Sequence, residues 1–150
     1  MQKKLIYISS VLSIFVLIIG CASKDLKSYE PKSPDEEAIV SLILSYEKAY
    51  NSKDVQGCKD LFSEEGWNMY SSRKIFSKAQ FDTVLPIQMA MFPIMKFQEP
   101  SHIEVSGMYA KVSLTQKYSS AVSGVSGGHI LYWIECVKEN QQWLLKSMKY

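Results

Sequence analysis

The spacing of apolar residues changes at about Pro93, and this change restricts the fold more than any other feature of the chain. Before Pro93, apolar residues recur every three or four positions, as they do along one side of a helix. After it, they alternate with polar residues, as in strands with one buried side. Helices followed by strands indicate an α+β fold rather than an alternating α/β fold. We therefore expect one α+β domain over residues 34–150, with three helices packed on an antiparallel sheet.

The first predicted helix has a defined start and one apolar side. Ser33 is a capping residue, Pro34 suits the first turn, and Glu36 completes a capping box with Ser33. Apolar residues then recur at helical spacing from Ile39 to Tyr50. This segment predicts a helix that begins at Pro34 and covers the core.

Two further helices and a series of strands are expected after it. The second helix is capped by Asp54 and ends at Gly66, and the third runs from Ser77 to about Met91. Pro86 lies inside the third helix, so we expect a kink or break near it. The segments with an extended or alternating pattern that follow are 94–99, 102–106, 110–115, 129–137 and 143–149.

The amino terminus has the layout of a secretory signal. Lys3 and Lys4 precede an apolar run, Leu5–Ile19, and Gly20 follows it. The run has roughly 15 residues, fewer than the ~20 that a membrane-spanning helix needs. We therefore interpret residues 1–20 as a signal peptide.

The end of this signal, Ile18–Cys21, resembles the lipobox of bacterial lipoproteins. The resemblance implies diacylglyceryl transfer to the Cys21 thiol, cleavage after Gly20 and acylation of the new amino terminus. Two acyl chains already hold a protein stably on a membrane. Residues 21–33 are polar and contain Pro31, so we expect a tether between the lipid and the domain. The alternative is an uncleaved single-pass anchor in which Cys21 has no role.

Localisation and charge follow from this interpretation. The protein is expected in the cell envelope, and the non-acidic Ala22 resembles the outer-membrane type where an organism has such a membrane. Lys3 and Lys4 account for two of the 17 basic residues, so the rest of the chain has as many basic residues as its 15 acidic ones. A neutral domain without a basic stripe does not suit nucleic acid. Charge therefore excludes nucleic-acid partners.

Cys58 and Cys136 are the two cysteines that lipidation leaves unexplained. An even number of cysteines in an exported protein is consistent with a disulfide. The alternative is two separate buried thiols that act as small apolar groups. The sequence leaves both interpretations open.

Several short segments resemble the nuclear transport factor 2-like superfamily, also called cystatin-like, over roughly residues 35–149. They are Tyr46–Asn51 with Asp54, Leu61–Ser63, the step Gly107–Val112, and Trp143–Leu145 after a turn. The resemblance implies a strongly bent antiparallel sheet wrapped around three helices as a cone, with a cavity between them. The superfamily includes isomerases, cyclases and dehydratases as well as non-catalytic binding modules, and a fold alone does not choose among them.

Candidate site residues follow from this cone. Tyr46 and Tyr50 on the first helix and Tyr118 and Tyr132 on strands are expected at its open end, as an apolar wall with hydrogen-bonding tips. The alternative is that they are ordinary core and rim tyrosines. Glu135 lies in the centre of a strand, but we expect it on the outer face, so no catalytic residue is assigned. His102 and His129 lack the spacing of metal ligands, and no motif indicates a cofactor.

The outer face of the predicted sheet supplies a second candidate surface. Leu131, Trp133 and Val137 lie on one side of the 129–137 strand, opposite its expected core residues. An exposed apolar surface of this kind fits a homodimer or a partner protein of the envelope. The sequence therefore favours a non-catalytic lipoprotein that binds a small apolar ligand or a protein. The alternatives are a small acid/base enzyme acting on a hydrophobic substrate, and an assembly role for the outer face.

Overall fold

The computed structural model describes residues 24–71, 74–121 and 127–149, so the predicted signal and Cys21 lie outside the described residues. The helices are α2 (Pro34–Asn51), α3 (Val55–Asp60) and α4 (Phe81–Met91), with 3-10 turns η2 (Leu26–Ser28) and η3 (Lys78–Gln80). The strands are β1 (Phe62–Ser71), β2 (Lys74–Ser77), β3 (Met95–Phe97), β4 (His102–Ser106), β5 (Tyr109–Tyr118), β6 (Gly128–Glu139) and β7 (Gln142–Lys149). No described helix is both long enough and apolar enough to cross a membrane.

The strands form one mixed sheet in the order β2-β1-β7-β6-β5-β3, and β4 pairs with the first half of β5. Most neighbouring strands are antiparallel, as expected, but β1 runs parallel to β7, with Phe62 opposite Leu145. The prediction of a purely antiparallel sheet is therefore wrong for this pair of strands. Alternating apolar residues indicate a strand, but they carry no information about the direction of its neighbour.

The first and third predicted helices are confirmed. Ser33 caps α2, where its hydroxyl oxygen accepts a hydrogen bond from the Glu36 N–H (3.1 Å). The third helix is present as η3 followed by α4, and the Ser77–Gln80 capping box lies at its start. α4 continues through Pro86 to Met91, so the chain does not break there.

The second helix is shorter than predicted. Asp54 caps α3 as expected, and its carboxylate accepts a hydrogen bond from the Gly57 N–H (2.8 Å), but the helix ends at Asp60 rather than at Gly66. Phe62 then begins β1, where it is buried and paired with β7. Apolar residues at 61 and 62 fit a helix or a strand, and the pairing with the last strand decides between them.

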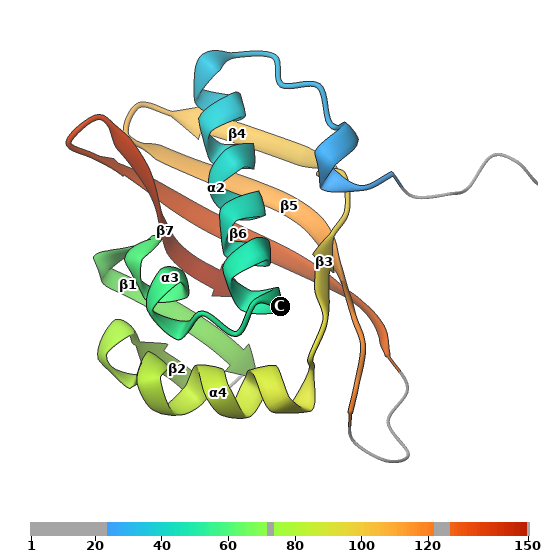
Figure 1. The fold of residues 1–150 in the computed structure, drawn as a ribbon. Coiled ribbons are helices and arrows are strands. Elements are labelled where there is room, and N and C mark those ends of the chain that lie inside the picture. Colours follow the sequence, from blue (N-terminus) through green and yellow to red (C-terminus); the bar gives the residue numbers. More distant parts are fainter. Residues whose placement is uncertain (1–23, 72–73, 122–126, 150) are drawn as a thin grey trace, which may run out of the picture.

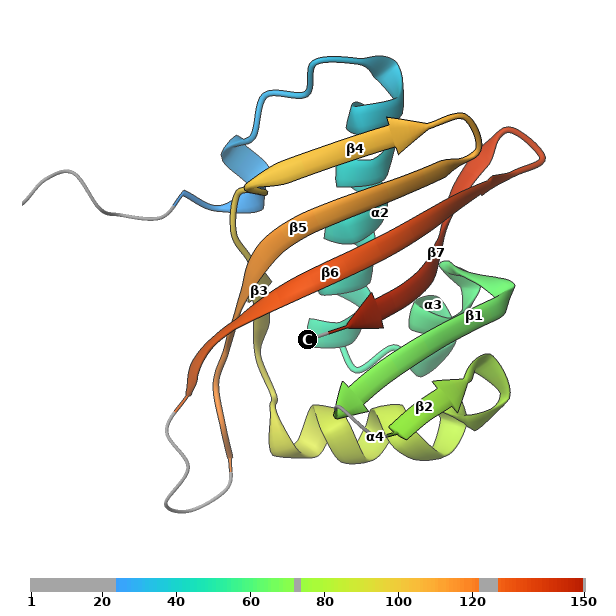
Figure 2. The ribbon, with the colours of Figure 1, turned by 180° about the vertical axis from the view of Figure 1, so that it is seen from behind.

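α2 lies on the concave side of the curled sheet, and α3 and α4 lie near the carboxyl-terminal half of α2 (Figure 1). Seen from behind, none of the described helices covers the convex side of β4, β5 and β6 (Figure 2). On β6 the buried residues are Tyr132, Ile134 and Cys136, which confirms the predicted core side of this strand. The core between α2 and the sheet also contains Ile39, Ile43, Tyr46, Phe97, Val112, Leu114, Leu145 and Met148.

Polar contacts fix α2 at its start. The Asp35 carboxylate accepts hydrogen bonds from the Lys138 ammonium (2.8 Å) and the Trp143 indole N–H (2.9 Å). These two donors lie on either side of the β6–β7 turn. The hydrogen bonds, with Lys138 as the larger cause, hold the pKa of Asp35 below its ordinary value.

The other end of α2 covers the free side of β3, and we call this contact the β3 edge. The Glu47 carboxylate accepts a hydrogen bond from the Phe97 N–H (2.7 Å). The Asn51 amide donates to the Met95 carbonyl and accepts from the Met95 N–H, both at 2.8 Å. Residues four apart lie on the same side of a helix, so two side chains replace the strand that β3 lacks on this side.

The segment expected as a tether is packed on the domain from Lys24 onward. The Lys24 carbonyl accepts a hydrogen bond from the Glu99 N–H (2.8 Å), and Asp25 pairs with Gln98 as an isolated β-bridge. Leu26 is only 1% exposed and belongs to the core. The polar composition of 21–33 hid this contact, because a single buried leucine gives no periodic signal.

Candidate functional site

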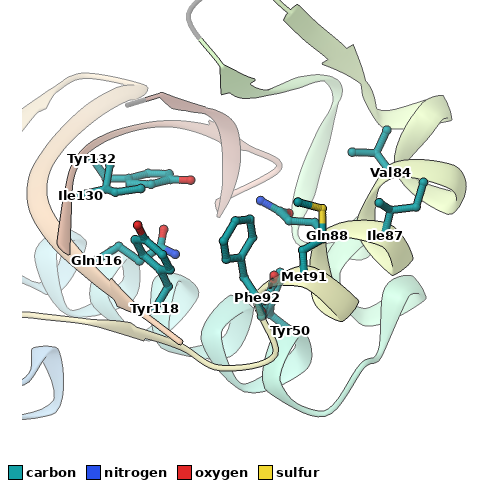
Figure 3. Close-up of a pocket in the computed structure, with 10 residues that line it drawn as sticks. All are labelled: Tyr50, Val84, Ile87, Gln88, Met91, Phe92, Gln116, Tyr118, Ile130 and Tyr132. Carbon is teal, nitrogen blue, oxygen red and sulfur yellow. Dashed lines mark hydrogen bonds between the residues drawn. The ribbon is translucent and has the colours of Figure 1, made fainter. Parts of the chain in front are cut away.

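An apolar pocket of about 540 Å³ opens where α4 faces the end of β5 and the start of β6. Figure 3 shows Tyr118 and Tyr132 from the sheet, Val84 and Ile87 from α4, and Phe92 between these two groups. The residues that line the pocket are mostly apolar or aromatic: Tyr50, Val84, Ile87, Gln88, Met91, Phe92, Gln116, Tyr118, Ile130 and Tyr132.

The strand register places the sheet side of the pocket. Gln116 lies opposite Ile130, and Tyr118 lies opposite Gly128, in the β5–β6 ladder. Alternate residues of a strand share a face, so Gln116 and Tyr118 both face the concave side. A Cβ atom on Gly128 would lie 3.0 Å from the Tyr118 hydroxyl oxygen. The missing side chain at Gly128 therefore leaves space for the phenol ring of Tyr118.

Tyr50 holds the turn after α4 in place. It is completely buried, and its hydroxyl donates a hydrogen bond to the Phe92 carbonyl (3.0 Å). Burial, and to a smaller extent the neighbouring Cys58, raises the pKa of Tyr50 well above its ordinary value. The hydroxyl thus stays protonated at neutral pH. The Phe92 ring in turn meets the Tyr118 ring edge-on, with centroids 5.2 Å apart.

Lys53 lies in the turn between α2 and α3 and binds the end of α4. Its ammonium donates hydrogen bonds to the carbonyls of Met89 (3.2 Å) and Pro93. A cation at this position also suits the negative end of the helix dipole. The same ammonium lies 5.4 Å from the centroid of the Tyr50 ring. The pocket wall is therefore fixed by contacts outside the pocket.

The structure brings together three of the four predicted tyrosines. Tyr50, Tyr118 and Tyr132 line the pocket, whereas Tyr46 is buried in the core. The Tyr46 ring packs 5.8 Å from the Phe62 ring, centroid to centroid, so it follows the alternative interpretation as a core residue. Helical spacing places tyrosines 46 and 50 on one side of α2, but it cannot tell which turn of the helix reaches the open end.

The α4 side of the pocket was missed by sequence reasoning. Val84, Ile87, Gln88 and Met91 come from this helix. Ile87 and Met91 are 58% and 42% exposed, which is unusual for large apolar residues on a helix that also packs on the core. The available signal was an α4 segment with more apolar residues than one buried side needs.

No carboxylate or histidine lines the pocket among the described residues. Glu47 is buried, but its carboxylate binds the backbone at the β3 edge. Glu135 lies on the convex face, as expected, with Ser147 and Lys149 as hydrogen-bond donors. Burial pushes the pKa of Glu135 upward, but these donors outweigh it and the net direction is downward. Neither carboxylate is placed to act as an acid or base in the pocket.

The cysteines follow the second of the two interpretations. Cys58 and Cys136 are free thiols, both buried. Burial raises the pKa of each to about 12. The described residues also contain no group of three or more His, Cys, Asp or Glu side chains that could hold a metal ion.

The predicted outer surface is exposed in part. Leu131 and Trp133 are 50% and 40% exposed on the convex face, and Val137 is half-buried. Tyr109, opposite Val137 in the β5–β6 ladder, is also largely exposed. These side chains therefore form an apolar strip along the convex face of the sheet.

Comparison with known proteins identifies the fold. No family model matches the chain, and no curated protein matches it. A protein of unknown function with a cystatin-like fold from Nostoc punctiforme has a TM-score of 0.62 at 16% identity, over 80% of this chain and 92% of that one. An NTF-2 like protein of unknown function from Shewanella oneidensis has a TM-score of 0.59 at 17% identity, over 76% of this chain and 96% of that one.

A ketosteroid isomerase-like protein from Erwinia carotovora is similar to the same degree. Its TM-score is 0.59 at 17% identity, over 75% of this chain and 91% of that one. At such identities the likeness establishes the fold and not the activity. The chain has a nuclear transport factor 2-like, cystatin-like fold, with three helices against a strongly curled mixed sheet.

Proposed function

We propose that this protein is a lipid-anchored lipoprotein of the cell envelope whose domain binds a small apolar ligand without catalysing a reaction. The observation that carries the proposal is the composition of the pocket. Its walls are aliphatic and aromatic, and no described carboxylate or histidine reaches it. An acid/base enzyme needs a titratable group at the reacting atom, whereas a binding site does not.

The size and exposure of the pocket support a ligand. A volume of about 540 Å³ lies within the range that small-molecule sites use. Ile87 and Met91 leave large apolar area open to water at the pocket, and a bound molecule would remove that area from water.

Binding is tested on the chain from Ala22 onward, which contains every described residue and lacks Cys21. Native mass spectrometry reports co-purified molecules, and the fluorescence of the apolar probe N-phenyl-1-naphthylamine reports affinity. Ile87→Glu puts a charge at the pocket and is expected to weaken probe binding at least tenfold. Leu131→Glu is the matched control, because Leu131 is similarly exposed on the convex face. Loss of binding in the control alone would place the ligand on the convex face and contradict the proposal.

Membrane anchoring is tested separately on the full chain. The basic start, the apolar run and Cys21 support lipidation. Cys21→Ser is expected to abolish incorporation of labelled palmitate and to leave the protein unprocessed. A Cys21→Ser variant that is processed as before would show that the thiol has no role in anchoring.

The convex strip favours a second candidate role, assembly through this face. Leu131 and Trp133 would be buried in a homodimer that joins two sheets face to face. Sedimentation of the chain from Ala22 measures the oligomeric state, and Leu131→Glu is expected to shift any dimer toward monomer. A monomer at all concentrations, with the same sedimentation coefficient for the original chain and the Leu131→Glu variant, would exclude homodimerisation.

A further inference from the structure

Two amide oxygens in the pocket have no hydrogen-bond partner. Among the described residues, the buried side-chain atoms without a partner are Ser63 Oγ, Gln88 Oε1, Gln116 Oε1 and Ser119 Oγ. The two glutamines line the pocket, and the two serines do not. Figure 3 shows the Gln88 and Gln116 side chains on either side of the Phe92 ring. One comes from α4 and the other from β5, so the two acceptors flank the pocket from opposite walls.

A buried amide oxygen can only accept a hydrogen bond, so it needs a donor near it. A serine hydroxyl can rotate toward another partner, but the amide carbonyl cannot become a donor. Three phenols also line the pocket, those of Tyr50, Tyr118 and Tyr132. The Tyr50 hydroxyl donates to the Phe92 carbonyl, and none of the three donates to either glutamine oxygen. A leucine or methionine at 88 or 116 would avoid the unmet acceptor. The glutamines therefore point to a donor supplied from outside the chain.

The charge of the pocket restricts that donor. No lysine or arginine lines it among the described residues, so nothing there neutralises a carboxylate head group. No aspartate or glutamate lines it either, so nothing compensates an ammonium group. The nearby Lys53 ammonium is held by the carbonyls of Met89 and Pro93. A buried charge without a partner is strongly unfavourable, so the donor is expected to be neutral.

We propose that the pocket binds a neutral, mainly apolar molecule with a hydroxyl head group, whose single O–H donates to one of the two side-chain oxygens, that of Gln116 or that of Gln88. This inference rests on the proposed function and adds the chemical class of the ligand. It selects apolar alcohols over the fatty acids and ethers of the same length. The apolar walls bind the hydrocarbon part, and the two amides select the head group.

The test measures the affinity of three probes that share one chain length for the chain from Ala22 onward. The probes are 1-decanol, 1-methoxydecane, which has no donor, and decanoate at pH 8, which is an anion. Displacement of N-phenyl-1-naphthylamine or calorimetry gives each affinity. We expect 1-decanol to bind about tenfold or more tightly than either of the other two, because only it supplies a donor to a buried acceptor.

Two substitutions, alone and combined, assign the preference to the amides. Gln88→Leu and Gln116→Leu are each expected to reduce the preference for 1-decanol over 1-methoxydecane in part, because the other oxygen can still accept. The double variant is expected to reduce it to about twofold or threefold, with the ether bound as well as before. Gln88 is only half-buried, so Gln88→Leu keeps the test available if Gln116→Leu does not fold. Circular dichroism and thermal unfolding check the fold of each variant.

The outcomes separate this inference from the proposed function. If no probe binds, the apolar pocket is not a binding site and both proposals fail. If 1-decanol and 1-methoxydecane bind equally, the pocket binds apolar molecules and only the hydroxyl preference is overturned. Tighter binding of decanoate, or a preference that survives both substitutions, would also overturn it.

Discussion

The β3 edge and the pocket both place polar side chains among buried apolar ones, with opposite results. At the β3 edge, Glu47 and Asn51 pair with the backbone of β3 at distances of 2.7 and 2.8 Å. In the pocket, the carbonyl oxygens of Gln88 and Gln116 have no partner. One region uses polar groups to complete a sheet, whereas the other keeps acceptors available in an open apolar cavity.

This difference separates residues that stabilise the fold from residues that serve a ligand. Buried polar groups are normally paired, because a buried donor or acceptor without a partner lowers the free energy of unfolding. Exceptions concentrate at functional sites, where stability is given up for binding. The comparison therefore predicts that apolar substitutions have opposite effects on stability in the two regions, and the following experiments test this.

The largest effect is expected where the amino-terminal segment packs beside the β3 edge. Leu26→Ala removes a side chain that is 1% exposed, so it should lower the free energy of unfolding by about 2–5 kcal/mol. Urea unfolding of the chain from Ala22 measures it. Leu131→Ala, at a residue that is 50% exposed, is the control and should change stability by less than ~1 kcal/mol. If Leu26→Ala lowers the free energy of unfolding as little as Leu131→Ala does, residues 24–29 do not belong to the folded unit.

The next effect concerns the polar pairing itself. Glu47→Ala leaves the Phe97 N–H buried without an acceptor, and we expect a loss of about 1–3 kcal/mol in the free energy of unfolding. Glu47→Gln keeps a neutral acceptor at the same place, so it should recover part of this loss. If the glutamine variant is as unstable as the alanine variant, the hydrogen bond is not what holds α2 against β3.

A smaller effect of opposite sign is expected in the pocket. Gln116→Leu removes an unmet acceptor from a site that is 5% exposed. The free energy of unfolding should stay within about 1 kcal/mol of the original value or rise. Urea unfolding is again the measurement. A loss of more than about 2 kcal/mol would falsify the contrast between the two regions, because Gln116 would then also be structural.

The last prediction concerns the two buried thiols, Cys58 and Cys136, whose ionisation should not affect stability at neutral pH. Burial raises the pKa of Cys58 and Cys136 to about 12, so both thiols stay protonated near pH 8. Ellman's reagent should react with the folded chain from Ala22 at least ~100-fold more slowly than with the unfolded chain. Their contribution to stability is present below about pH 8.5 and is lost as pH rises toward about 12. Fast labelling of either thiol at pH 8 would show that the packed core opens readily.

The fold was predictable from the sequence wherever a local rule decides the structure. The Ser33 and Asp54 caps gave the starts of two helices, and alternation gave the buried side of β6. The parallel pairing of β1 with β7 was not predictable, because it joins Phe62 to Leu145 across most of the chain. Such long-range pairings leave no periodic signal in either segment alone.

The site was predictable from the sheet side and from Tyr50 of α2, but not from α4. Tyr118 and Tyr132 alternate along their strands, so their common face could be inferred. The α4 wall depends on how that helix is placed against the sheet, which its own sequence does not encode. The unmet amides of Gln88 and Gln116 are a property of the assembled pocket, since any residue's partners are known only after folding.

The packing of Lys24 and Leu26 on the domain also determines how freely the domain would move over a membrane. With the lipid on Cys21 as proposed, the chain from Cys21 to Lys24 spans at most about 10 Å when fully extended. A domain on so short a linker stays next to the bilayer surface and turns only within a narrow range of orientations. Its ligand would then pass between lipid and protein over a short distance, with little time in bulk water.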